Sequence, residues 1–177
     1  MMDRPLLISA ILEHGADQFG HQLIVSRETH GPLHRYTYAD MARRSKQLAN
    51  ALTSLGLKWG SVVGTIAWNN YRHLESYYAV SGSGMVIHTC NPRLHPDQLA
   101  YIINHADDEV IFFDSTFAPL VKAIAPHCSK VKHWICFSDQ PNTPSIEGID
   151  VKNYEDLITA HKNVFNWPDV DEKSGAA

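Results

Sequence analysis

Short apolar runs alternate with stretches of helical periodicity over most of this chain. A continuous apolar run of a few residues is typical of a strand that is buried on both faces of a sheet. Four such runs are predicted strands, at residues 61–67, 85–89, 109–113 and 130–137. Apolar residues at helical spacing lie between them and predict helices at 70–80, 96–106 and 115–124. This alternation predicts an α/β fold, with a mostly parallel sheet flanked by helices.

The first part of the chain precedes this alternation. Apolar residues at helical spacing predict a helix at 5–18, and two short predicted strands at 21–27 and 33–38 are joined by a polar link that suits a small N-terminal hairpin. Thr37 and Asp40 then resemble a capping box, in which a threonine and an acid three residues later satisfy the first amides of a helix.

The helix that follows the hairpin has one apolar stripe and is expected to end at Gly56, since glycine is common just after the last helical turn. The stripe consists of Met41, Leu48, Leu52 and Leu55. In the next predicted helix, Leu74, Tyr77 and Tyr78 are expected to face inward.

The chain is less regular after the fourth predicted strand. Residues 138–150 contain two prolines and many turn formers, which predicts a loop, and residues 154–160 predict a last short helix. From residue 163 onward the chain is polar. We therefore expect an α/β unit at residues 1–162 and an exposed connector at 163–177.

Composition and charge are those of an ordinary soluble globular domain, with 44% hydrophobic and 19% charged residues. A net charge of -4 argues against a nucleic-acid partner, because proteins that bind nucleic acids present a basic face.

The sequence contains no apolar run long enough for a transmembrane segment and no evident signal peptide. Cys90, Cys128 and Cys136 form no CxxC pair and are expected to be buried, reduced thiols of a cytoplasmic protein.

Gly82 and Gly84 are the only closely spaced glycines of the α/β region, and they follow a predicted helix. A phosphate-binding loop of the dinucleotide type needs its glycines between a strand and the helix after it. The order is reversed here, so we expect Gly82–Gly84 to end a helix and to allow close contact between helix and sheet. The sequence thus contains no glycine-rich loop that would hold a phosphate.

The eleven histidines of the chain show no spacing that predicts a metal site. His30 and His34 are four residues apart, but the Gly-Pro pair between them excludes the helix that would bring them together. His88 lies in a predicted buried strand, where a hydrogen-bonded core histidine is expected.

The acidic run at 107–109 is expected to be a solvated turn. No cysteine has an evident histidine partner, and no catalytic constellation is evident.

Arg93 is the candidate ligand-binding residue. It follows a predicted strand and the turn Asn91-Pro92. Ligands of α/β sheets bind at the carboxyl ends of the strands, and a guanidinium group there could hold a phosphate through two hydrogen bonds. A structural arginine that pairs with an acid or with carbonyl groups is the alternative.

Several segments resemble the N-terminal part of the AMP-forming acyl-CoA synthetases, which are adenylate-forming ligases. The segment from Trp68 to Leu94, which includes the sequence Asn-Pro-Arg-Leu, carries most of the resemblance, and it is closest to the medium- and long-chain and methylthiopropionate-type branch. Residues 37–41 and 99–114 carry the rest. The resemblance extends from about Tyr36 to the end of the chain and more weakly before it.

The resemblance implies a reaction in two halves. A carboxylate attacks the α-phosphate of ATP to give acyl-AMP and pyrophosphate, and the thiol of CoA then displaces AMP. It implies ATP, Mg²⁺ and CoA for the parent enzyme, a fatty or other carboxylic acid as substrate, and a homodimer in some long-chain relatives. It also implies that Arg93 contacts a phosphate of CoA. The residues that catalyse the reaction are expected outside this chain, so the fragment alone is expected to be inactive and to bind no cofactor.

Two other hypotheses remain open from the sequence. One is a stand-alone binding or dimerisation module with a flavodoxin-like sheet, which would bind a small ligand without any further domain. The other is a self-contained enzyme, which the missing phosphate loop and the missing nucleophile argue against.

Overall fold

The computed structural model describes residues 5–29 and 32–177. The chain begins with helix α1 (Ile8–Phe19) and an antiparallel hairpin of β1 (Leu23–Arg27) and β2 (Leu33–Thr37), as predicted. His30, one of the two histidines considered as a metal-binding pair, lies outside the described residues.

A five-stranded sheet forms the centre of the molecule, in the order β4-β3-β5-β6-β7, and every neighbouring pair is parallel. Its strands are β3 (Val62–Ile66), β4 (Val86–Thr89), β5 (Asp108–Phe113), β6 (His133–Cys136) and β7 (Val151–Asn153). The predicted parallel sheet is confirmed. β7 was not predicted, because this short edge strand contains Lys152 and Asn153 and has no apolar run.

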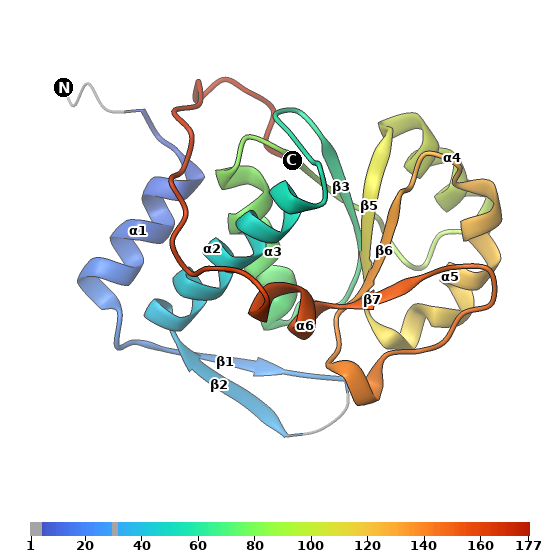
Figure 1. Cartoon of the computed structure of the whole chain (residues 1–177), viewed down its shortest axis with the longest axis horizontal. Coiled ribbons are helices and arrows are strands. Elements are labelled where there is room, and N and C mark those ends of the chain that lie inside the picture. The colour runs from blue at the N-terminus through green and yellow to red at the C-terminus, as the bar shows by residue number, and fades with distance from the viewer. Residues whose placement is uncertain (1–4, 30–31) are drawn as a thin grey trace.

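Helices cover both faces of this sheet, and Figure 1 shows α4 and α5 on one side and α2, α3 and α6 on the other. The helices are α2 (Tyr38–Ser54), α3 (Tyr71–Gly82), α4 (Pro96–Ala106), α5 (Ala118–Ile124) and α6 (Tyr154–Thr159). Three single 3₁₀ turns lie at Ser115–Phe117, Ala125–His127 and Gln140–Asn142. α1 and the hairpin form an outer layer against α2 and α3 (Figure 1).

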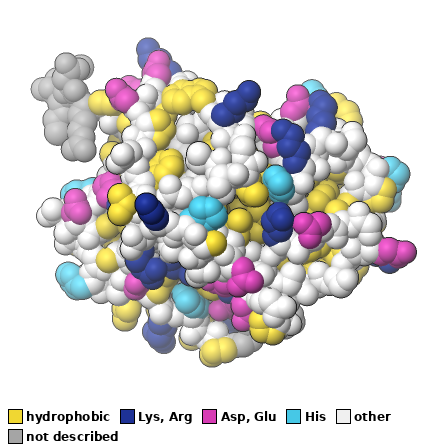
Figure 2. All heavy atoms as spheres, viewed as in Figure 1, with side chains coloured by type: hydrophobic (Ala, Val, Ile, Leu, Met, Phe, Trp, Pro, Cys, Tyr) yellow, Lys and Arg dark blue, Asp and Glu magenta, His cyan; other side chains and the backbone are white. Residues whose placement is uncertain are grey.

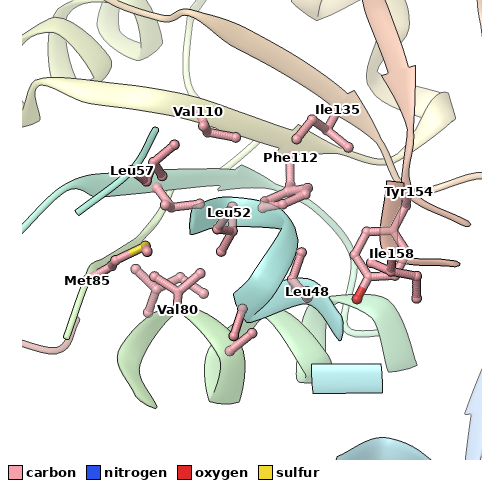
Figure 3. Packing of buried hydrophobic residues seen from close by; sticks show 14 of the residues in the cluster. Leu48, Leu52, Leu57, Val80, Met85, Val110, Phe112, Ile135, Tyr154 and Ile158 are labelled. Atoms are coloured by element: carbon pink, nitrogen blue, oxygen red, sulfur yellow. The ribbon is translucent and has the colours of Figure 1, made fainter. Parts of the chain in front are cut away.

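The side chains of the central strands alternate between the two faces of the sheet, as the pleat requires. Val110 and Phe112 pack in the cluster with α2, α3 and α6, whereas Ile111 and Phe113 pack with α4 and α5. Figure 3 shows Phe112 directed toward Leu52 of α2. Strands that are buried on both faces explain why the sequence shows continuous apolar runs here.

The predicted capping box of α2 is present. The backbone N–H of Asp40 donates to Thr37 Oγ1 at 3.1 Å, and the backbone N–H of Thr37 donates to Asp40 Oδ2 at 3.2 Å. Gly56 has a φ of 88°, a conformation that glycine adopts without strain, and the chain leaves the helix there. Both local signals in the sequence therefore set the bounds of α2.

The prediction for the inward face of α3 was wrong in part. Tyr77 is 39% exposed, while Arg72, His73 and Glu75 are buried. α3 lies between the sheet and the outer layer, and its polar side chains find charged or hydrogen-bonding partners inside. Apolar periodicity alone could not predict this, because polar residues are placed on the outer face by default.

Residues 163–177 contain no helix or strand, but they are not simply an exposed connector. Phe165 and Trp167 pack against the core, and the Trp167 indole donates to Glu13 of α1 at 2.6 Å. A Cβ atom at Gly82 would come within 2.9 Å of the Trp167 ring. The close approach expected of Gly82 is therefore made by this last segment and not by the sheet.

A buried ion network joins α2, α3 and α6. Arg44 Nε donates to Glu75 at 2.8 Å, and the two terminal nitrogens of Arg44 donate to Glu155 at 2.9 and 3.0 Å. The Glu75 side chain is fully buried and also accepts a bond from the Tyr154 hydroxyl at 2.7 Å. Burial raises the pKa of Glu75 although Arg44 opposes that shift.

Arg72 extends the network to the hairpin. Its Nε donates to Glu155 at 2.7 Å and its terminal nitrogen donates to Glu28 at 2.9 Å. Burial favours the protonated form of Glu155, but Arg44 and Arg72 together outweigh burial and lower its pKa. Every charge in this network therefore has a partner of the opposite sign.

Arg44→Ala is expected to lower the free energy of unfolding by about 3–5 kcal/mol, because it leaves the carboxylate of Glu75 buried without its cation. Arg43→Ala is the matched control on the same helix. Arg43 is half exposed and bonds to Asp40 at 3.4 Å, so its loss is expected to change stability by no more than about 0.5 kcal/mol. Urea denaturation of both variants measures the difference. Equal losses would show that the network is not a main source of stability.

Candidate functional site at the carboxyl edge of the sheet

The strand order changes direction at β3, and this topology marks the edge where ligands bind in α/β sheets. β4 follows β3 in the chain and lies on one side of it, and β5 comes next and lies on the other side. The crevice outside the carboxyl ends of such neighbouring strands is the usual ligand site. Here it is bounded by the segments that follow β3 and β5.

Asp114 ties these two segments together. Its carboxylate accepts from the backbone N–H of Trp68 at 2.6 Å and from Asn70 Nδ2 at 2.9 Å. Asn70 in turn caps α3 by accepting from the backbone N–H of His73 at 3.0 Å. The Asp114 side chain makes no cap bond to the segment that follows it, where a 3₁₀ turn precedes α5.

Two hollows open at this edge. The larger has a volume of about 520 Å³ and is lined by polar and charged groups, including Glu28, Asn70, Arg72, Asp114, Ser138 and Asp139. The smaller, of about 250 Å³, lies between the ends of β3 and β4 and the start of α3. These hollows offer hydrogen bonds, carboxylates and one guanidinium group to a ligand.

His73 borders the smaller hollow. Its Nε2 lies 3.0 Å from Thr65 Oγ1, and its Nδ1 lies 3.2 Å from the carbonyl oxygen of Trp68. Burial lowers the pKa of His73, so the imidazole is held in its neutral form. The sequence did not single out His73, because no recognisable motif surrounds it.

Arg93 lies in the turn after β4, as predicted, and it is exposed. The side chain of Asn91 shapes this turn by accepting from the Arg93 backbone N–H at 3.0 Å. Within the described part of the chain, the Arg93 guanidinium has no ion pair or hydrogen bond. The structural alternative, an arginine paired with an acid or a carbonyl, therefore finds no partner there.

The structure also brings together three residues that the sequence treated separately. His88 Nδ1 lies 2.8 Å from Asp108 Oδ2, and Cys90 Sγ lies 3.7 Å from His88 Nδ1. His88 is hydrogen-bonded, as expected, but it is partly exposed and not a core residue. Burial of all three cysteines is confirmed. Two further expectations were wrong: Asp108 is fully buried, and Cys90 has a histidine neighbour.

Gly82 and Gly84 end α3, as expected. Gly82 is the last helical residue, and Gly84 has a φ of 77° in the turn to β4. A Cβ atom at Gly84 would come within 2.8 Å of the Trp59 ring. These glycines therefore fit a helix end and two tryptophan contacts, at the opposite edge of the sheet from the hollows.

The charged side chains on the face shown in Figure 2 are interspersed, with lysine and arginine next to aspartate and glutamate. This face therefore carries no continuous basic patch. In residues 5–29 and 32–177, no helix is long and apolar enough to span a bilayer.

The fold and this edge define a class: an α/β domain with a parallel sheet whose carboxyl edge is the candidate ligand site. Comparison with known proteins then identifies the family. A family model described as AMP-binding enzyme matches residues 12–171, and the chain therefore belongs to the AMP-binding enzyme family. This confirms the resemblance that the segment from Trp68 to Leu94 indicated.

Similar proteins are known from both sequence and structure. The chain is 46% identical to a 3-methylmercaptopropionyl-CoA ligase of Ruegeria lacuscaerulensis, over 100% of this chain and 33% of the relative. It is 42% identical to a medium-chain-fatty-acid–CoA ligase of Ectopseudomonas oleovorans, over 100% of this chain and 32% of the relative. The chain thus spans about a third of the length of these relatives.

The crystal structure of an anthranilate CoA ligase in complex with anthranoyl-AMP has the same fold. It matches 98% of this chain and 32% of that chain, with a TM-score of 0.85 and 18% sequence identity. The predicted fold class, the N-terminal subdomain of the acyl-CoA synthetase fold, is confirmed by this match.

Asp114 is expected to make stability depend on pH in the acidic range. Burial raises its pKa from 3.8 to about 6. The folded chain therefore binds this proton more tightly than the unfolded chain, and the resulting stability is present below about pH 4 and lost as the pH rises through about 6. The full change is on the order of 3 kcal/mol.

Asp114→Asn removes this titration. The stability of the unaltered protein relative to this variant is expected to fall as the pH rises from about 4 to about 7. Urea denaturation at several pH values measures it, with the exposed Asp150→Asn variant as the control for loss of one carboxyl group. If the difference in the free energy of unfolding between Asp114→Asn and the unaltered protein does not vary with pH, the raised pKa assigned to Asp114 is contradicted.

Proposed function

We propose that this chain is the N-terminal part of an ATP-dependent, AMP-forming ligase that joins a fatty or other carboxylic acid to CoA. The parent enzyme forms acyl-AMP and pyrophosphate from ATP and the acid, and then acyl-CoA and AMP. The observation that carries this proposal is the 46% identity, over the whole chain, to a 3-methylmercaptopropionyl-CoA ligase. Similarity to a medium-chain-fatty-acid–CoA ligase supports a fatty acid or a related short acid as substrate.

Within that enzyme, the role we assign to Arg93 is contact with a phosphate of CoA. An exposed guanidinium beside the carboxyl edge of a parallel sheet is suited to bind a phosphate through two hydrogen bonds. ATP and Mg²⁺ are placed on residues outside this chain, since the sequence contains no loop that would hold a triphosphate. We place the catalytic residues outside this chain as well.

The arrangement of the parent enzyme follows from the same proposal. Residues 1–162 form an α/β unit, and residues 163–177 lead toward the part of the enzyme that binds the phosphates of ATP.

The three buried, free cysteines are consistent with a reducing, cytoplasmic location. The hairpin exposes the apolar side chains of Leu23, Val25 and Leu33, which supports a homodimer contact through this region. Family membership does not favour the alternative of a stand-alone binding or dimerisation module.

Arg93→Ala in the full-length enzyme is expected to raise KM for CoA roughly tenfold to hundredfold, which corresponds to loss of one charge-assisted bond to a phosphate. ATP–pyrophosphate exchange, which does not need CoA, is expected to stay unchanged. Arg35→Ala, which removes an exposed arginine from the hairpin, is the control. An unchanged KM for CoA in Arg93→Ala would contradict the role of Arg93 and leave the ligase assignment intact.

Residues 1–177 alone are expected to form no acyl-AMP, because the proposal places the residues that bind ATP elsewhere. ATP–pyrophosphate exchange with a series of carboxylic acids, measured on the purified chain, tests this. Exchange above that of a boiled sample would overturn the proposed division of the enzyme.

A further inference from the structure

His88, Cys90 and Asp108 form a cluster on the sheet face that α4 and α5 cover. His88 lies in β4 and Cys90 follows the last residue of β4. Residues two apart on a strand point to the same face, so both side chains lie on one side of the sheet. Cys90 packs there with Ile66 and Ile111, which places the cluster on this face.

A β-bulge brings Asp108 to the same face. In the pairing of β3 with β5, Val62 lies opposite Asp108 but Val63 lies opposite Val110, so the register shifts by one residue. Regular alternation would place Asp108 on the face of Val110, which packs with the other helical layer. A bulge re-aims the side chain next to it, and here it turns Asp108 toward His88.

Gly64 leaves the space through which this carboxylate reaches His88. Gly64 is the residue of β3 that pairs with His88 of β4. A Cβ atom at Gly64 would lie only 3.0 Å from Asp108 Oδ2 and 2.4 Å from the side chain of Ile111. Glycine is therefore required at this position for the acid to cross β3.

The carboxylate is buried and only half satisfied. Asp108 is 0% exposed, and while its Oδ2 bonds to His88 at 2.8 Å, its Oδ1 has no hydrogen-bond partner. A buried carboxylate oxygen without a partner is costly and uncommon in folded proteins. Cys90 Sγ lies 3.7 and 3.9 Å from the two ring nitrogens of His88, over the ring and not in line with one nitrogen.

We infer that His88, Cys90 and Asp108 form a binding site for a zinc-like divalent cation. One imidazole nitrogen, the sulfur of Cys90 and one carboxylate oxygen lie within 4.8 Å of one another. Such a mixed set suits Zn²⁺ or Co²⁺, whereas a thiolate disfavours Mg²⁺ and Ca²⁺. The proton of the Cys90 thiol passes to solvent when the ion binds. The proton between His88 Nδ1 and Asp108 moves to Nε2 of a neutral imidazole, or passes to solvent when Nε2 already carries a proton, so His88 binds the ion as a neutral imidazole.

The site needs local adjustment to hold an ion. In a tetrahedral zinc site the ligand atoms lie about 3.3–3.7 Å apart. The nitrogen–oxygen distance of 2.8 Å must open by roughly half an ångström, and Cys90 Sγ, at 3.7 and 3.9 Å from the two ring nitrogens, must move toward the nitrogen that binds the ion. The His88 side chain is 25% exposed, so the cluster is not closed off on the His88 side. His88 and Asp108 lie on β4 and β5, which both pair with β3, and Cys90 directly follows β4, so the sheet holds the backbone of the site.

Titration of the metal-free protein with Co²⁺ alone tests this inference, because cobalt bound to a thiolate absorbs in the near ultraviolet. Histidines elsewhere on the surface can bind metal ions but do not give this band. One Co²⁺ per chain is expected to produce the band, and one equivalent of Zn²⁺ is expected to abolish it by displacement. Cys90→Ala is expected to remove the band, and Asp108→Asn is expected to weaken Co²⁺ binding at least about tenfold.

Cys136→Ala is the matched control, because Cys136 is an equally buried cysteine on β6 and must leave the band unchanged. Thermal unfolding adds a second measurement, since a bound ion stabilises the folded state. Zn²⁺ is expected to raise the Tm of the unaltered protein and of Cys136→Ala but not of Cys90→Ala. No thiolate band in the unaltered protein, or a band that survives Cys90→Ala, would overturn the site and leave a hydrogen-bonded His–Asp pair beside an inert thiol.

Discussion

The ion network centred on Arg44 is the interaction on which the arrangement of the layers depends. Arg44 of α2 holds Glu75 of α3 and Glu155 of α6, and Arg72 connects the same Glu155 to Glu28 after β1. These segments are far apart in the chain, and three of them pack on one face of the sheet. Because each buried charge needs its partner, the network disfavours any placement of these segments that separates the charges. Apolar contacts alone would fix that placement less strictly.

This placement also orders the carboxyl edge of the sheet. Arg72 lies within the first turn of α3, and the same turn carries Asn70 as its cap and His73 beside the smaller hollow. Asp114 then connects the start of α3 to the end of β5. The helix that carries much of the ion network is therefore also the helix that shapes the edge where ligands of this fold class bind. One helix thus contributes to stability and borders the candidate ligand site.

The sequence predicted most of the fold but less of the candidate site. Continuous apolar runs predicted β3 to β6, and the pairing of Thr37 with Asp40 predicted the start of α2, because both signals are local. The buried polar face of α3 could not be predicted, since the bond from Arg72 to Glu155, for example, spans 83 residues of the chain. The burial of Asp108 depends on a register shift between two strands, which no local pattern of residues reveals. Arg93 could be placed correctly because a turn after a strand is a local feature.

The central claim is that the enzyme to which this chain belongs activates a carboxylic acid through an adenylate. The most direct measurement is the identity of the nucleotide product when the full-length protein is incubated with ATP, Mg²⁺, CoA and a fatty acid. The account predicts AMP and pyrophosphate in equal amounts with acyl-CoA, and acyl-AMP when CoA is omitted. Formation of ADP and phosphate, or no consumption of ATP with any carboxylic acid, would contradict it.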